Sequence, residues 1–150
     1  MAFRNLAHVG ITVADMERSL RFYTELLNAE IILDTTVSSP GLSRTVSVPD
    51  AELHIVLMQL GNTVLELIDY AHQTGQRILA DNSQPGAMHV AFEVNDIDAA
   101  YQELTERGVE FNAPPYTFTD DDGPGVAGIR IAYFRDPDGN QLEMVSVPAG

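Results

Sequence analysis

The chain of 150 residues contains no cysteine and no lysine. The first absence excludes disulfides, thiolate metal ligands and a cysteine nucleophile, and it fits a reducing compartment. The second excludes a Schiff base on a lysine. The sequence also lacks an apolar run of about 18 residues, the length at which a membrane span becomes plausible, and it lacks a signal-peptide core at its start. We therefore expect a soluble protein of the cytoplasm.

Positive charge is scarce. Arginine supplies all 8 basic residues against 22 carboxylates, which gives a formal net charge of −14. A field of this sign repels nucleic acid and anionic membranes, so we expect neither as a partner. The length suits a single domain with one core, or two small modules that share a sheet. A small molecule is the expected partner.

The clearest positive feature is an internal repeat with an offset of 81 residues. Residues 8–13 (HVGITV) match residues 89–94 (HVAFEV), and an aspartate follows each segment two residues later. A second pair of segments closes the two halves: residues 63–68 (TVLELI) correspond to residues 140–145 (NQLEMV). Each half thus opens with a histidine, His8 or His89, and ends with a glutamate, Glu66 or Glu143.

The hydrophobic pattern predicts a β-α-β-β-β order in each half. We expect a single domain over residues 1–150, with module one at about residues 4–70, a connector at 71–86 with a short helix near 77–80, and module two at about 87–148. Aspartates at 15 and 96 are expected to cap the two helices, and Gly108 to end the second one. The predicted strands cover 6–13, 31–36, 53–60, 64–70, 88–94, the region of Phe111, 116–118, 128–134 and 141–147.

The four repeated residues share a predicted orientation. In residues 6–13 the apolar side chains alternate with His8, Gly10 and Thr12, so His8 lies on the face opposite the helix-packed core. Glu66 and Glu143 each stand between two apolar residues on a strand, where a carboxylate is costly unless it is paired or binds a metal. Each of the four alone is best interpreted as structural. Together they favour one site for Mn, Fe, Co, Ni or Zn.

At these motifs the chain resembles the vicinal oxygen chelate superfamily, which includes glyoxalase I, methylmalonyl-CoA epimerase, extradiol dioxygenases and bleomycin-binding proteins. The resemblance implies an α+β fold of two tandem βαβββ modules, which form a U-shaped, mostly antiparallel mixed sheet around a central cavity. It further implies a single metal held by His8, Glu66, His89 and Glu143, and a homodimer. The segments that carry it are 8–13 with Asp15 and 22–23, 65–67, 88–91 and 136–143.

A set of two histidines and two glutamates is similar to that of bacterial glyoxalase I and of the epimerases. The resemblance then implies an isomerase or epimerase that moves a proton on the carbon next to a metal-chelated carbonyl, through an enediolate, with Glu66 and Glu143 as general bases. A glyoxalase I-like lyase is the first alternative. An Fe(II) ring-cleaving dioxygenase and a non-catalytic binding or resistance protein follow.

The substrate stays open between a CoA thioester, a glutathione adduct and a cyclic or sugar-like ketone. Residues 10–13 lack the arginine that holds glutathione in bacterial glyoxalases. Residues 86–89 are similar to the segment that leads to the second histidine in methylmalonyl-CoA epimerases. Arg44 and Arg130 are candidate anion contacts, although a structural role is favoured for both. The loop 119–125 is interpreted equally as a lid or as a solvated insertion. His54 and His72 are interpreted as residues outside the site.

Overall fold

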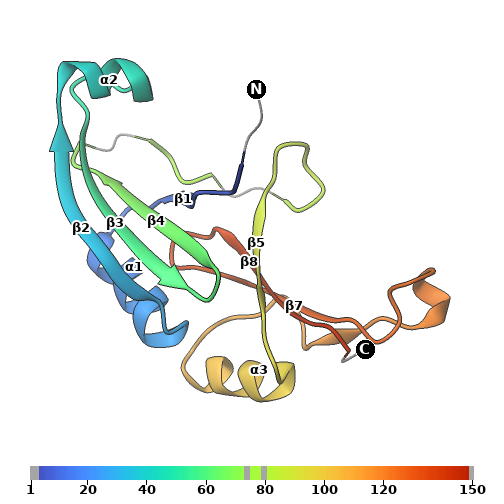
Figure 1. Cartoon of the computed structure of the whole chain (residues 1–150). Coiled ribbons are helices and arrows are strands. Elements are labelled where there is room, and N and C mark those ends of the chain that lie inside the picture. The colour runs from blue at the N-terminus through green and yellow to red at the C-terminus, as the bar shows by residue number, and fades with distance from the viewer. Residues whose placement is uncertain (1–3, 73–74, 79–80, 149–150) are drawn as a thin grey trace. The chain divides into compact units, whose positions relative to one another are not determined.

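The computed structural model describes residues 4–72, 75–78 and 81–148 and divides the chain into two compact units, Met1–Gln76 and Arg77–Gly150 (Figure 1). Both units are built alike around a four-stranded sheet. Unit 1 contains β1 (Val9–Thr12), α1 (Met16–Arg21), the π-helical turn η1 (Phe22–Leu26), β2 (Glu30–Ser38), α2 (Pro40–Val46), β3 (Glu52–Leu60) and β4 (Thr63–Tyr70). Unit 2 contains β5 (His89–Glu93), α3 (Ile97–Glu106), β6 (Tyr116–Thr117), the 3-10 turn η2 (Asp120–Asp122), β7 (Arg130–Arg135) and β8 (Gln141–Ser146).

The two sheets have the same topology. Their strand orders are β1-β4-β3-β2 and β5-β8-β7-β6. In each sheet the first and last strands of the unit are parallel neighbours, β1 with β4 and β5 with β8, and the other pairs are antiparallel. The predicted fold class of two tandem, mixed and mostly antiparallel βαβββ modules is therefore confirmed.

Both predicted helix caps are present. The Asp15 carboxylate accepts a hydrogen bond from the backbone N–H of Arg18 at 2.9 Å, and the Asp96 carboxylate accepts from the N–H groups of Asp98 and Ala99. These bonds satisfy N–H groups that have no partner inside the first helical turn. Gly108 follows α3 with a φ of 88°, the left-handed conformation expected after a helix.

The core of each unit lies between its sheet and its helix. In unit 1, where α1 covers one face of the sheet (Figure 1), the apolar residues of β1 and β4 alternate with residues of the opposite face. Ile11, Leu65 and Leu67 are buried with Tyr23 from η1. In unit 2 the corresponding buried residues are Ile97, Leu104, Phe134, Leu142 and Met144.

Some strand boundaries and one helix differ from the expectations. Strand β1 begins at Val9, so residues 6–8 precede the strand. Helix α2 was not expected, because Gly41, Ser43 and Thr45 are poor helix formers; it is started by Ser39, whose hydroxyl accepts from the N–H of Leu42, and by a proline at its first position. Phe111 forms only an isolated bridge with Phe134 instead of a strand.

The short helix expected near residues 77–80 falls partly outside the described residues. Residues 77 and 78 have no regular structure, and residues 79 and 80 are not described. Within residues 4–72, 75–78 and 81–148, no helix is both long enough and apolar enough to cross a membrane.

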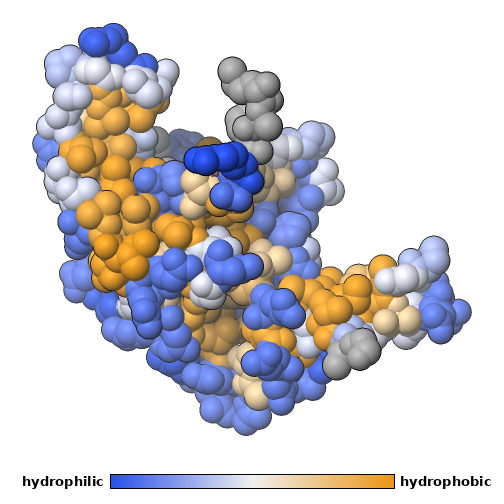
Figure 2. Space-filling model, in the orientation of Figure 1, coloured by the Kyte–Doolittle hydropathy of each residue, from blue (hydrophilic) through white to orange (hydrophobic). Residues whose placement is uncertain are grey.

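Strand β2 is the edge of the first sheet and exposes apolar side chains. The side chains of Ile31, Ile32 and Leu33 are each close to half exposed, and the pairing with β3 shifts register at this place. Figure 2 shows the resulting apolar surface over β2 and β3. The shift has the character of a β-bulge, a device that limits pairing at a sheet edge.

The turn that leads into β8 is organised by a buried aspartate. The Asp136 carboxylate accepts hydrogen bonds from the N–H groups of Asp138 and Asn140 and from the Asn140 side-chain amide. Asp138, also buried, forms an ion pair with Arg77 at 3.3 Å. The expected turn at 136–139 is confirmed, and Gly139 adopts a φ of 89° within it.

We predict that Asp136→Ala lowers the free energy of unfolding by about 2–4 kcal/mol, because buried N–H groups lose a charged acceptor. Urea unfolding followed by circular dichroism measures this loss. The matched control is Asp121→Ala on the exposed turn η2, which should change stability by less than about 0.5 kcal/mol. Equal stabilities of the two variants would contradict the role assigned to Asp136.

Candidate functional site

The first predicted pair of residues is in contact in unit 1. The register of the parallel strands sets Gly10 of β1 beside Glu66 of β4, and His8, two residues before Gly10, lies on the same face. The His8 Nε2 and Glu66 Oε2 atoms are 3.2 Å apart. The Glu66 side chain is 18% exposed and the His8 side chain 46% exposed. A mostly buried carboxylate therefore meets an imidazole that solvent can reach.

Gly10 leaves room for this carboxylate. A Cβ atom placed at Gly10 would lie 3.4 Å from Glu66 Oε2. A side chain larger than a methyl group at position 10 would crowd the Glu66 carboxylate. Glycine at this position avoids that contact.

Unit 2 repeats the arrangement with shorter contacts. The register of β5 and β8 sets Ala91 beside Glu143, and His89 again stands two residues before this position. The His89 Nε2 and Glu143 Oε2 atoms are 2.9 Å apart. Glu143 is more deeply buried than Glu66, with a side chain 10% exposed, while His89 is 44% exposed.

The two glutamates differ in the residue opposite them on the antiparallel neighbour. Leu57 of β3 pairs with Glu66, whereas Tyr133 of β7 pairs with Glu143. Burial raises the pKa of the Tyr133 phenol, and a hydrogen bond to Glu143 and the charge of that carboxylate raise the pKa further. The phenol therefore keeps its proton at neutral pH.

The alternation of β7 contained a signal for Tyr133. Ala132 and Phe134 are buried on the core face, so Tyr133 must lie on the face that carries Glu143. Counting outward from the turn at residues 136–140 also pairs residue 133 with residue 143.

The donor atoms of each pair suit a divalent metal. Two ligands bound at about 2.1 Å in tetrahedral or octahedral geometry stand roughly 3.0–3.4 Å apart. The Nε2 to Oε2 separations of 3.2 and 2.9 Å are close to this range. Among residues 4–72, 75–78 and 81–148, no three histidine or carboxylate side chains gather into one metal-binding group. Each unit thus brings together one histidine and one glutamate.

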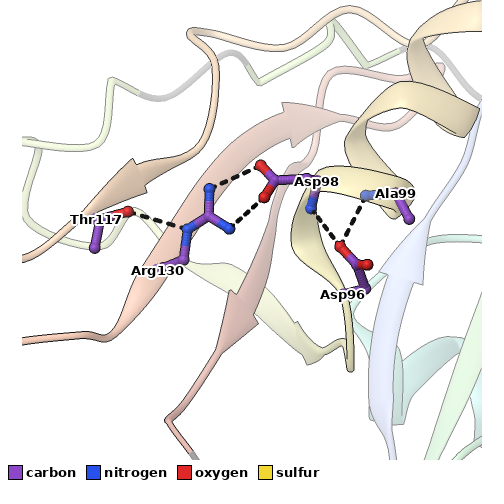
Figure 3. Close-up of polar contacts among 5 residues, drawn as sticks. All are labelled: Asp96, Asp98, Ala99, Thr117 and Arg130. Carbon is purple, nitrogen blue, oxygen red and sulfur yellow. Dashed lines mark hydrogen bonds and ion pairs between the residues drawn. The ribbon is translucent and has the colours of Figure 1, made fainter.

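Arg130, a candidate anion contact, is engaged within unit 2 (Figure 3). Its two terminal nitrogens bind the two carboxylate oxygens of Asp98 at 2.6 and 2.7 Å, and its Nε donates to the Thr117 hydroxyl. The pair links β7 to the first turn of α3, which Asp96 caps (Figure 3). The Arg130 hydrogen bonds hold the pKa of Asp98 below its usual range, although partial burial opposes this shift.

The other two histidines lie apart from the pairs. His54 is on β3 and contacts Asp34 of β2 through Nε2 at 2.7 Å. His72 follows β4 and is exposed. Arg44, the second candidate anion contact, is exposed on α2.

The acidic loop is closed by its own residues. Asp122 accepts hydrogen bonds from the Thr119 N–H, the Thr119 hydroxyl and the Tyr116 hydroxyl. The bond from the Thr119 backbone, followed by that from Tyr116, holds the pKa of Asp122 below its usual range. The contacts of Asp122 are therefore local ones, and they give the loop a defined turn.

A family model matches residues 5–144, and its description is the Glyoxalase/Bleomycin resistance protein/Dioxygenase superfamily. The chain belongs to this superfamily. The predicted membership is thus confirmed. Because the match covers both units, it includes all four residues of the His–Glu pairs.

Several relatives are epimerases by name. The chain is 38% identical over 148 residues to a 2-epi-5-epi-valiolone epimerase from an Actinomyces species, covering 95% of this chain and 79% of the relative. It is 30% identical over 109 residues to the human mitochondrial methylmalonyl-CoA epimerase, covering 69% of this chain and 54% of the relative.

Solved structures of the superfamily share the fold. A glyoxalase family protein from Bacillus cereus superposes with a TM-score of 0.82 at 19% identity, covering 97% of this chain and 95% of that chain. A lactoylglutathione lyase from Schizosaccharomyces pombe is also similar, at 29% identity over 154 residues, covering 97% of this chain and 48% of the relative. The epimerase and lyase relatives support an enzyme that acts on a small molecule.

The Arg130–Asp98 pair predicts an acid-sensitive contact. The folded pKa of Asp98 lies below its unfolded value, so the stabilisation is complete above the unfolded pKa and is lost as the pH falls through the folded pKa. Carboxyl ¹³C NMR should show Asp98 titrating below the usual aspartate range. Arg130→Gln should return it to that range, whereas the control Arg107→Gln, at the other end of α3, should leave it unchanged. An unshifted Asp98 in the parent protein would contradict the prediction.

Proposed function

We propose that this protein is a divalent-metal-dependent epimerase that moves a proton on the carbon next to a carbonyl group. The observation that carries the proposal is the pair of His–Glu contacts at equivalent strands of the two units, with distances suited to one coordinated ion. The relationship to a named epimerase at 38% identity over nearly the whole chain supports the reaction class.

In this proposal His8, Glu66, His89 and Glu143 hold the ion, which is Mn, Co, Ni, Fe or Zn. The four side chains would come from one chain or be shared between the two chains of a homodimer. When bound, the ion would polarise the substrate carbonyl and so acidify the neighbouring C–H bond. The four side chains provide imidazole nitrogen and carboxylate oxygen, which suit such metals.

The glutamates would carry out the proton transfer. One starts as a carboxylate and takes the proton as the C–H bond breaks; the other starts as a carboxylic acid and gives its proton to the opposite face of the same carbon. Two proton carriers at pseudo-equivalent positions are what inversion requires. The carbon is inverted, one proton has been taken up and one released. Before the next turnover in the same direction, the first glutamate must release its proton to solvent and the second must take one up.

We propose a cyclic or sugar-like ketone as the substrate class. The relative with the higher identity is named for a valiolone, and the other for a CoA thioester. A CoA thioester carries phosphates, but this chain has no lysine, and the Arg130 guanidinium is bound to Asp98 and Thr117. A neutral, hydroxylated ketone fits the strongly acidic chain better than a polyanion does.

The first test is metal content. The purified protein, reconstituted with Mn²⁺, should retain about one ion per site in plasma mass spectrometry, because a four-donor set is complete. His8→Ala with His89→Ala should lose that ion. The matched control is His54→Ala with His72→Ala, which removes the two histidines outside the pairs. A parent protein that retains no Mn, Fe, Co, Ni or Zn would overturn the metal proposal and favour a binding protein.

The second test follows the proton. In deuterated water the metal-loaded protein should exchange the hydrogen beside the carbonyl of 2-epi-5-epi-valiolone and produce its epimer. Glu66→Gln and Glu143→Gln should each slow this exchange by about 10²-fold or more, the contribution expected of a general acid–base group. The two variants must keep the parent circular dichroism spectrum for the comparison to hold.

Methylmalonyl-CoA and a glutathione hemithioacetal serve as the alternative probes. Faster exchange with the thioester would reject the ketone proposal and retain the epimerase. Conversion of the hemithioacetal to a thioester would favour the glyoxalase-like lyase. Oxygen consumption without exchange would contradict proton transfer and favour the dioxygenase.

A further inference from the structure

Tyr133 lies beside both members of the His–Glu pair in unit 2. It stands directly opposite Glu143 of β8, and a hydrogen bond to that carboxylate is among the causes that raise the pKa of its phenol. Its ring meets the His89 imidazole edge to face, with centroids 5.3 Å apart and planes at 75°. One side chain therefore faces the carboxylate across the strand pair and packs against the imidazole.

Unit 1 has no such donor at the equivalent place. The turn at Gly61–Asn62 pairs Leu57 with Glu66, in the same relation that the turn before β8 gives to Tyr133 and Glu143. A leucine side chain cannot donate a hydrogen bond, so Glu66 has His8 as its contact without a tyrosine hydroxyl. The greater exposure and the longer histidine distance of Glu66 agree with a less restrained carboxylate.

We propose that Tyr133 is a positioning residue, which orients Glu143 and His89 for the ion and makes the two otherwise equivalent glutamates unequal. This inference rests on the proposed metal-dependent function and deepens it. A carboxylate has lone pairs for both a hydroxyl donor and a metal, so Tyr133 and the ion can use Glu143 together. Partners of this kind orient metal ligands, and their loss typically weakens metal binding by about 10–100-fold.

The test is Tyr133→Phe, which removes the hydroxyl and keeps the ring. Mn²⁺ affinity, read from the free-ion signal in electron paramagnetic resonance, should fall by about 10-fold, because Glu143 loses the group that orients it. Tyr116→Phe is the matched control. It deletes the same hydroxyl from a tyrosine of the same unit that also donates to an aspartyl carboxylate, Asp122, outside the site.

A second readout needs no metal. In ¹³C-labelled, metal-free protein, the His89 ring resonances should shift and broaden in Tyr133→Phe, while those of His8 in the other unit should not. Thermal unfolding distinguishes a general loss of structure from loss of orientation, and it should be close to that of Tyr116→Phe. A purely structural role would lower the unfolding temperature and disturb residues of the unit broadly.

The outcomes separate the two proposals. Weaker Mn²⁺ binding with a selective change at His89 supports the positioning role. Parent-like Mn²⁺ affinity in Tyr133→Phe overturns it, while metal binding and exchange by the parent protein leave the proposed function intact. If the parent protein binds no metal, the proposed function fails, and the His89 resonances alone decide whether Tyr133 orients the pair; unchanged resonances overturn that role.

Discussion

The register of one parallel strand pair in each unit brings the histidine and the glutamate of the candidate site together. Because the first and last strands of a unit lie side by side, a residue near its beginning meets a residue near its end, and His8 reaches Glu66 as His89 reaches Glu143. A slip of one residue would turn the carboxylate into the apolar core and the neighbouring leucine out of it. The burial of Leu65 and Leu67 on either side of Glu66 therefore also specifies where the carboxylate points.

Sequence reasoning succeeded where the chain repeats itself and failed where a single copy departs from the repeat. Asp15 and Asp96 predicted both helix starts because capping depends on one local side chain. Helix α2 was missed because its residues have weak helical preference and its start depends on Ser39 and the following proline. Tyr133 was missed for another reason: its position matters because of the residue across the hairpin, and that partner follows only when the alternation of β7 is combined with the turn at residues 136–140.

The two glutamates have histidines as partners, and this choice affects the charge near each carboxylate. Histidine and tyrosine can contact a carboxylate while remaining neutral, whereas arginine always brings a full positive charge. The arginines in the ion pairs of the described residues bind other carboxylates, among them Arg130 with Asp98 and Arg77 with Asp138. The histidine partners of Glu66 and Glu143 can stay neutral, and carboxylate lone pairs then remain for a cation. An arginine in place of either histidine would satisfy the same buried carboxylate and compete with the metal for it.

The apolar edge strand β2 has a colloidal consequence. The exposed side chains of Ile31, Ile32 and Leu33 lie beside backbone groups that could pair with another chain, and the bulge alone blunts this edge incompletely. At neutral pH the net charge of −14 keeps molecules apart. That repulsion disappears near the isoelectric point of about 4.3. Near that pH the molecules no longer repel one another while the edge of β2 stays open, so association through this edge becomes favourable. The protein should therefore be handled well above that pH.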